Sequence, residues 1–204
     1  MNIISQPPQF LTNYARGWVG FISRHDNFIA DGIDWFSRWD ELDHVPISHT
    51  FNIVGQDTTV EALEPEVSYG SLHDYLDDPE IALLVRKPRT RFFERICNQA
   101  ILRLGDKYNN RLIAALALNE TFLGRALNKF SLGAFESWLV RRALRPHTWD
   151  CSMLVTETLR QPDLIPLGGV LTWTPGTVKP IDLFEDQNLF EPGAIELVPS
   201  SRQS

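Results

Sequence analysis

The stretch that most constrains the fold is PISHTFNIVGQDTTVEAL, residues 46–63, in which apolar and polar residues alternate on both sides of the triplet GQD. Alternation with a period of two is typical of a half-buried strand, and a short polar break between two such runs is typical of a β-hairpin. We therefore predict two antiparallel strands joined by a three-residue loop, with Val54 paired to Thr58 across the loop.

This register brings an imidazole and a carboxylate together. Phe51 then faces Glu61, and His49 becomes the diagonal neighbour of Glu61 on the same face of the hairpin. Both polar side chains interrupt largely apolar runs, and burying a charge is costly unless it is paired. We therefore expect His49 and Glu61 to point toward the core and to contact each other. A register shifted by one residue would instead place Glu61 in solvent, and an inward histidine can also be a hydrogen-bonded core residue without a catalytic role.

The rest of the chain mixes strand-like and helical patterns. Helical spacing of apolar residues predicts a helix over 26–39 behind the cap Asp26 and another over 90–105 that ends at Gly105. Short apolar runs at 17–23 and 81–87 predict two further strands. We expect an α+β fold in which a small, mostly antiparallel sheet packs against helices.

Segment composition suggests how this fold is divided along the chain. We expect an N-terminal extension over 1–16, one domain over 17–173 with a helical insertion at about 112–146, and an irregular C-terminal tail over 174–204. The basic cluster VRKPRTRFFER is expected to decorate a solvated helix face.

Charge and hydropathy limit the partners that we expect. The formal net charge is −7, whereas nucleic acids and anionic membranes require a basic face, so we expect no nucleic-acid partner. The sequence shows no apolar run of about 20 residues that would span a membrane. Its first residues lack the basic segment and apolar core of a secretory signal, so a cytoplasmic location is expected.

The two cysteines, Cys97 and Cys151, stand in different surroundings. Cys97 lies within an apolar helical stripe and is expected to pack. Cys151 follows Asp150, which we predict to cap a helix whose inward face carries Leu154, Val155 and Thr158. Unpaired N–H groups and the helix dipole favour a thiolate at such a helix start, and the thiolate is the nucleophilic form. Because free cysteine is often buried, position alone also allows a packing role.

The order of four motifs, ISHTFNIV, VEAL, DKYNNRL and WDCSMLVTETL, resembles the circularly permuted papain-like branch of the NlpC/P60 superfamily, the YiiX-like group. In that group a histidine strand of the SHV type comes first, a v.EA strand carries the third polar residue, and the nucleophile comes last in a CSeLV helix. The resemblance covers most of residues 17–160. It implies a permuted papain-like fold and a cysteine-dependent hydrolase that acts on an amide, isopeptide or acyl bond without a cofactor.

The resemblance also implies a role for individual residues. Cys151 would be the nucleophile, His49 the general base and acid, and Glu61 the residue that orients His49. Tyr108 matches an aromatic residue near the active site of the group, although Asn109 stands where the group usually has aspartate. Weaker substrate-binding candidates are Tyr108, Trp149, Asp150 and Ser152, and Trp18 and Tyr69 are further aromatic residues that would line a cleft if they are not simply packed.

Other functions remain open at this stage. A thiol acyltransferase related to the same group usually carries the motif NCEHF, which this chain lacks. A binding or scaffold domain would keep the fold without the chemistry. A zinc site is disfavoured because the two cysteines and the inward histidine show no ligand spacing, so we expect no metal. The expected partner is a substrate with a peptide or acyl bond.

Overall fold

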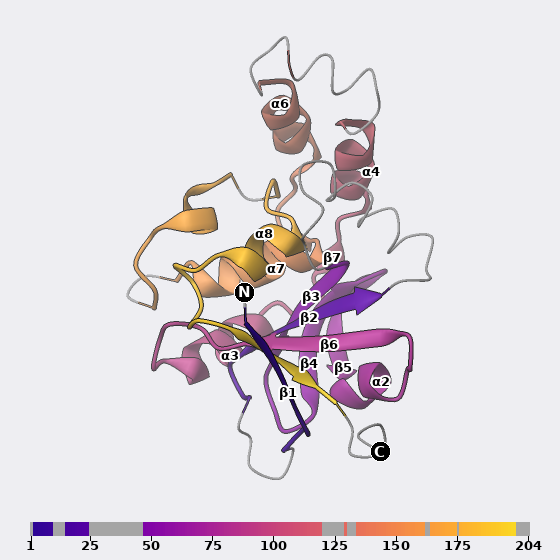
Figure 1. Cartoon of the computed structure of the whole chain (residues 1–204). Helices are drawn as coiled ribbons and strands as arrows, with labels where there is room; N and C mark the ends of the chain where they lie inside the picture. Colours follow the sequence, from indigo (N-terminus) through magenta and orange to yellow (C-terminus); the bar gives the residue numbers. More distant parts are fainter. Residues whose placement is uncertain are drawn as a thin grey trace.

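The computed structural model describes residues 2–9, 15–24, 47–119, 129, 134–161, 164–174 and 176–198. These residues form one mixed sheet with helices packed on it, which confirms the prediction of an α+β fold (Figure 1). The sheet has nine strands within the described ranges, so the expectation of a small sheet is wrong. The helix predicted over 26–39 lies outside the described residues.

The strands follow the order β1-β9-β6-β2-β3-β4-β5-β7-β8 across the sheet. The pairs β1–β9 and β7–β8 are parallel and the other neighbouring pairs are antiparallel. The strands are β1 (Ile3–Gln6), β2 (Val19–Arg24), β3 (His49–Ile53), β4 (Thr58–Leu63), β5 (Glu66–Ser71), β6 (Ile81–Arg86), β7 (Lys107–Tyr108), β8 (Thr148–Trp149) and β9 (Ala194–Leu197).

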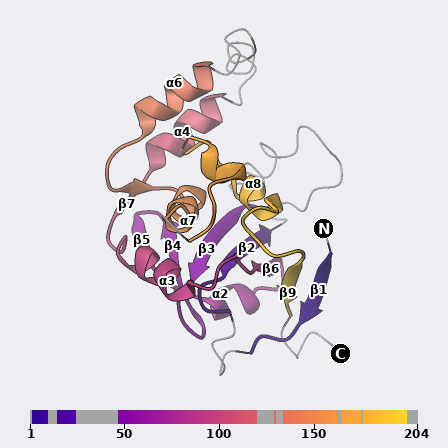
Figure 2. The same cartoon turned by 90° about the vertical axis from the view of Figure 1, so that its left-hand side faces the viewer.

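Helices cover both faces of this sheet, and strand β6 is apolar on both sides. In β6, Leu84 packs in one core with residues of α7 and α8, whereas Leu83 and Val85 pack in another with α2. Figure 2 shows α7 and α8 lying over the strands. The helices are α2 (Leu72–Leu76), α3 (Phe93–Ile101), α4 (Asn110–Asn119), α6 (Ala134–Ala143), α7 (Cys151–Leu159) and α8 (Pro180–Glu185), with a 3₁₀ turn η2 (Gly169–Thr172).

The hairpin has the predicted register. Asn52 pairs with Val60 and Ile53 with Thr59, and the backbone N–H of Val54 donates to the carbonyl of Thr58 at 2.9 Å. Continuing this register along the strands places Phe51 opposite Glu61. The alternation of apolar and polar residues therefore predicted both the pairing and the face on which each side chain lies.

The C-terminal segment is not irregular, contrary to the prediction. Pro180 occupies the first position of α8, and Asp182 accepts a hydrogen bond of 2.7 Å from the backbone N–H of Lys179, so the helix start is capped. Strand β9 then pairs with β6 on one side and with β1 on the other, so part of the predicted N-terminal extension joins the same sheet. The many prolines and turn residues in this segment predicted irregular chain, although it contains the short helix α8 and the short strand β9.

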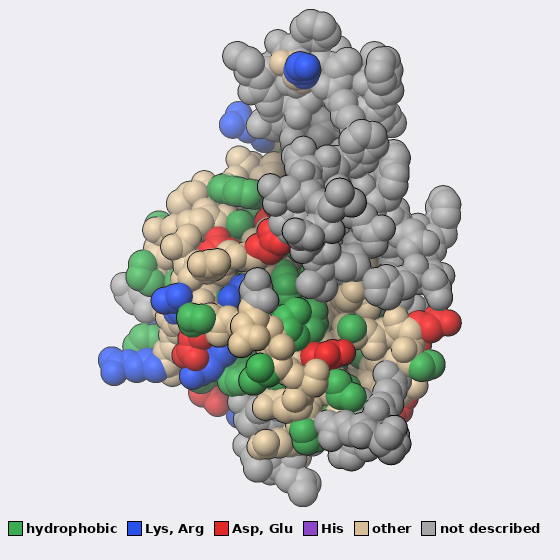
Figure 3. Space-filling model, viewed as in Figure 1, with side chains coloured by type: hydrophobic (Ala, Val, Ile, Leu, Met, Phe, Trp, Pro, Cys, Tyr) green, Lys and Arg blue, Asp and Glu red, His purple; other side chains and the backbone are tan. Residues whose placement is uncertain are grey.

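The basic cluster that we expected on a solvated helix face is divided: Arg95 is exposed on α3, whereas Arg86 and Arg89 hold the C-terminal segment. Arg86 is 1% exposed, and its guanidinium donates to the backbone carbonyls of Phe184, Asp186, Glu191 and Gly193. Burial lowers the pKa of Arg86 to about 10, so it stays charged at neutral pH. On the side of the molecule drawn in Figure 3, some Lys and Arg side chains lie beside Asp and Glu side chains in the described part of the surface.

The predicted helical insertion contains α4 and α6, which pack against each other through Leu112, Val140 and Ala143. Both cartoon views show the pair standing away from the sheet (Figures 1 and 2). Helix α3 ends at Ile101 rather than at Gly105, because a turn separates its last residue from the glycine, which has a φ of 81°. In the described ranges, no helix has both the length and the apolar character to cross a membrane.

Candidate active site

Cys151 is the first residue of α7, as predicted. The side chain of Asp150 accepts a hydrogen bond of 2.8 Å from the backbone N–H of Met153 and so caps the helix. The predicted inward face is buried: Leu154, Val155 and Thr158 are each at most 1% exposed. Cys151 itself is 7% exposed, so its thiol lies at the buried start of a helix that packs on β3 and β4.

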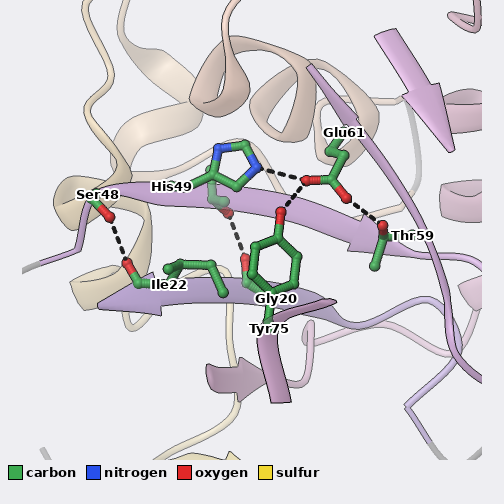
Figure 4. A network of polar contacts seen from close by, with 8 residues as sticks. Gly20, Ile22, Ser48, His49, Thr59, Glu61 and Tyr75 are labelled. Atoms are coloured by element: carbon green, nitrogen blue, oxygen red, sulfur yellow. Dashed lines mark hydrogen bonds and ion pairs between the residues drawn. The ribbon is translucent and has the colours of Figure 1, made fainter. Parts of the chain in front are cut away.

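His49 and Glu61 contact each other across the hairpin. The Nε2 atom of His49 lies 2.9 Å from Oε2 of Glu61, and the two side chains are 14% and 3% exposed. Figure 4 shows the second ring nitrogen of His49 directed away from Glu61. Cys151 lies near enough to this ring for its thiol to raise the pKa of His49.

The carboxylate of Glu61 contacts side chains from three elements, β3, β4 and α2 (Figure 4). Thr59, two residues earlier on the same strand, donates from Oγ1 to Oε1 at 2.6 Å. The hydroxyl of Tyr75 in α2 donates to Oε2, the oxygen that also contacts His49. On the neighbouring strand β5, a Cβ atom at Gly70 would lie 1.9 Å from Oε1 of Glu61, so the carboxylate occupies the space that a side chain would need.

These contacts favour the charged forms of both groups. Burial alone would lower the pKa of His49, but hydrogen bonds and charge interactions with Cys151 and Glu61 raise it from 6.5 to about 10. Burial alone would raise the pKa of Glu61, but the hydrogen bond and positive charge of His49, with the hydroxyls of Thr59 and Tyr75, lower it below its usual value. These interactions therefore favour an imidazolium paired with a carboxylate.

A pH dependence of stability follows from the lowered pKa of Glu61. A carboxyl group with a lower pKa in the folded chain than in the unfolded chain stabilises the fold above the unfolded value, here 4.5, and this contribution is lost as the pH falls through the folded value. We expect the free energy of unfolding of the wild type to fall more steeply below pH 4.5 than that of Glu61→Gln. Urea titrations at a series of pH values measure both slopes, and parallel slopes would contradict the assignment.

The two tyrosines near Cys151 remain neutral. Burial raises the pKa of Tyr108, and the negative charges of Cys151 and Asp150 raise it further. Burial and the charge of Glu61 raise the pKa of Tyr75, with a smaller effect from Cys151. Tyr108 and Tyr75 therefore both lie within electrostatic reach of the thiol, as hydroxyl donors rather than as anions.

Three of the weaker substrate-binding candidates serve the structure around α7. Trp149 is 7% exposed, and its indole N–H donates to Oδ2 of Asp106 at 2.8 Å. Asp150 is the helix cap. The hydroxyl of Ser152 lies 2.8 Å from Oδ1 of Asp150 and 2.5 Å from the carbonyl oxygen of Val178. These side chains are buried and bonded within the protein, whereas Tyr108 keeps partial exposure and its pKa responds to Cys151.

The remaining aromatic candidates lie elsewhere. Tyr69 is 56% exposed on β5. Trp18 lines a pocket of about 190 Å³ together with residues of β1, β6 and β9, none of which belongs to the Cys151 site. Neither observation places these two rings beside the thiol.

Asn109, which differs from the aspartate expected from the resemblance, has a local structural role. It is 2% exposed, and its Oδ1 accepts a hydrogen bond of 3.0 Å from the backbone N–H of Leu112 in the first turn of α4. Asparagine and aspartate are equally suited to this capping position. The departure from the group's pattern therefore leaves the helix start intact.

Cys97 packs, as predicted. It is fully buried in a core with Ala100 and Leu154, and its thiol donates to the carbonyl of Ile53 at 3.7 Å. Burial raises the pKa of Cys97, which disfavours its thiolate. Among the residues that the structure describes, no group of three histidine, cysteine, aspartate or glutamate side chains is placed to hold a metal ion.

Sequence reasoning missed Thr59, Gly70 and Tyr75. The period of two along β4 places Thr59 on the same face as Glu61, so this contact was open to prediction. The requirement for glycine at position 70 and the approach of Tyr75 depend on how β5 and α2 pack against the hairpin. No local pattern in the sequence reports that packing.

Comparison with protein-family models gives no match for this chain, and comparison with curated proteins gives none either.

The space at Gly70 leads to a testable prediction. In Gly70→Ala, the new methyl group would overlap Oε1 of Glu61, so either the carboxylate or β5 must move. We expect a loss of about 1–3 kcal/mol in the free energy of unfolding, the usual cost of overpacking, together with slower alkylation of Cys151. Urea denaturation and peptide mapping after brief iodoacetamide treatment measure the two effects.

Gly168→Ala is the matched control for this variant. Gly168 has an extended backbone, and the nearest atoms to its added methyl group are 3.9 Å away. We expect it to change the free energy of unfolding by less than about 0.5 kcal/mol and to leave Cys151 unaffected. Equal behaviour of the two variants would contradict the close packing of Glu61 against Gly70.

Proposed function

We propose that this protein is a cysteine-dependent hydrolase that cleaves an amide, isopeptide or acyl bond with Cys151, His49 and Glu61. The observation that carries the proposal is the buried pair of His49 and Glu61, with the imidazole close enough to Cys151 for the thiol to raise its pKa. This arrangement of nucleophile, base and orienting group is the one that acyl transfer requires. The resemblance to the permuted papain-like group supports the same assignment.

In the first half of the reaction, His49 already holds the proton of Cys151, and the sulfur of the resulting thiolate attacks the substrate carbonyl carbon. The carbonyl π electrons move to oxygen, which gives a tetrahedral oxyanion. When the oxyanion collapses, the bond to the leaving nitrogen or oxygen breaks and His49 returns the proton to that atom. A thioester on Cys151 remains.

In the second half, His49 removes a proton from water while the water oxygen attacks the thioester carbon. Collapse of the second oxyanion breaks the carbon–sulfur bond, and the thiolate regains its interaction with the imidazolium as the carboxylic acid leaves. Glu61 keeps its charge throughout and holds the ring in place. The backbone N–H of Cys151, which has no acceptor within the helix, is positioned to donate to both oxyanions.

The test is the formation of an acyl-enzyme. We expect p-nitrophenyl acetate to acetylate Cys151, as seen by intact-protein mass spectrometry with peptide mapping, and the acetyl group to be lost on further incubation. Cys151→Ala should abolish the adduct, whereas Cys97→Ala should retain it because that thiol is buried in the core. Labelling that is equal in the wild type and in Cys151→Ala would contradict the proposal and favour a binding domain.

A further inference from the structure

Helix α2 presents Tyr75 to the hairpin in a fixed orientation. Leu72 and Leu76 anchor the helix in the core, and the hydroxyl of its cap Ser71 accepts from the backbone N–H of His73. The Tyr75 ring stacks on Phe51, with centroids 5.1 Å apart and an interplanar angle of 8°. This packing leaves the phenol little freedom to rotate away from the site.

The Tyr75 hydroxyl bonds to the same oxygen of Glu61 that contacts His49. It donates to Oε2, which is also the atom that contacts Nε2 of His49. Thr59 donates to the other oxygen, Oε1, so each carboxylate oxygen accepts from one neutral hydroxyl and Oε2 also contacts the imidazole. The two donors lie on different elements and fix the plane of the carboxylate as well as its position (Figure 4).

We infer that Tyr75 is a positioning residue of the active site, whose hydroxyl holds Glu61 in the orientation that directs His49 toward Cys151. The inference rests on the proposed function and adds a fourth residue to it. Tyr75 acts through Glu61 and takes no part in the bond changes. Its contribution is to keep the carboxylate ionised and to prevent it from turning away from the imidazole.

A tyrosine is suited to this position because its hydroxyl donates without carrying a charge. Burial and the charge of Glu61 raise the pKa of Tyr75, so the donor persists over the whole working range of pH. The charged and titratable groups around the pair are His49 and Cys151 on the site side and Asp74 in α2 itself. Of these, His49 is the group that becomes a cation, and it lies in contact with Glu61.

Tyr75→Phe isolates the hydroxyl because phenylalanine keeps the ring that stacks on Phe51. A hydrogen bond to a charged group contributes roughly 1.5–3 kcal/mol, which corresponds to about one to two pKa units. With this donor removed, Glu61 should protonate at higher pH. We expect the acid limb of the pH profile of Cys151 alkylation to move up by about one unit, and the plateau rate to fall about threefold to tenfold.

Tyr69→Phe is the matched control, because it removes a hydroxyl from a tyrosine that is 56% exposed on the adjacent strand. It should reproduce the wild-type profile. A merely structural role for Tyr75 would lower the melting temperature without moving the acid limb, and that result would overturn the inference. Thr59→Val removes the second donor to Glu61 and should move the same limb in the same direction, so it replaces Tyr75→Phe if that variant does not fold.

The design separates this inference from the proposed function. If wild-type Cys151 alkylates no faster than an ordinary thiol and does not respond to loss of His49, the proposed function fails and the inference fails with it. If Cys151 depends on His49 but Tyr75→Phe and Thr59→Val both keep the wild-type acid limb, the inference alone is overturned. A shift in both variants, with none in Tyr69→Phe, supports it.

Discussion

Replacing His49 with alanine lowers the rate at which iodoacetamide alkylates Cys151 at pH 6 by about 100-fold, according to the proposed pairing. An ordinary thiol with a pKa of about 8.5 is only about 0.3% ionised at this pH. In the wild type, Glu61 stabilises the imidazolium of His49, and the proposal is that this imidazolium stabilises the thiolate of Cys151. Removing the imidazole therefore returns Cys151 to the low reactivity of a buried thiol.

Cys97 is the internal control for this experiment, since both cysteines are buried in the same molecule and Cys151 is the one that raises the pKa of His49. Peptide mapping at several times gives the two rates separately. His147→Ala controls for the loss of an imidazole, because His147 is exposed and pairs with Asp106 rather than with the site. Equal rates for Cys151 in the wild type and in His49→Ala would contradict the pairing.

Replacing Arg86 with methionine costs about 3–5 kcal/mol in the free energy of unfolding. The guanidinium donates to four backbone carbonyls between residues 184 and 193, and the side chain is 1% exposed. Methionine fills much of the volume of the arginine side chain, but it cannot donate to the buried carbonyl oxygens. Each oxygen left without a donor costs roughly 1–3 kcal/mol unless water replaces the donor. The loss should also expose the segment that carries α8 and β9 to limited proteolysis.

The neighbouring Lys87 offers a matched control for this stability prediction. It pairs with Glu191 at 2.8 Å, but the lysine and glutamate side chains are 37% and 49% exposed. Exposed ion pairs of this kind contribute about 0–1 kcal/mol. Lys87→Met should therefore change the free energy of unfolding by a small fraction of the Arg86→Met effect. Urea denaturation of both variants decides the question, and similar losses would contradict the assigned role of Arg86.

The hairpin was the part of the fold that the sequence specified most fully. A period of two fixes which side chains share a face, and a loop of known length fixes the register, so the contact between His49 and Glu61 followed from local pattern and the cost of burying a charge. The start of α7 followed in the same way from Asp150 as a cap. These predictions depended on short-range rules that tertiary packing did not override.

The features that the sequence did not predict depend on packing between segments that are far apart in the chain. The position of Tyr75 depends on how α2 folds back onto β3, and β9 gains its place by pairing with strands far away in the sequence. Arg86 stands in a run of basic residues that looks like a solvated surface, yet its side chain lies inside the protein because backbone carbonyls from the C-terminal segment surround it. Local composition does not report such contacts.

The central claim is that Cys151, His49 and Glu61 form one coupled charge network, and the titration of His49 tests it most directly. Nitrogen-15 NMR of the histidine rings reports the protonation of each ring nitrogen as the pH changes. In the wild type we expect His49 to remain an imidazolium well above pH 6.5, toward its raised pKa of about 10. In Cys151→Ala the midpoint should fall, because one of the two groups that raise it is gone. A midpoint near 6.5 that is identical in both proteins would contradict the account.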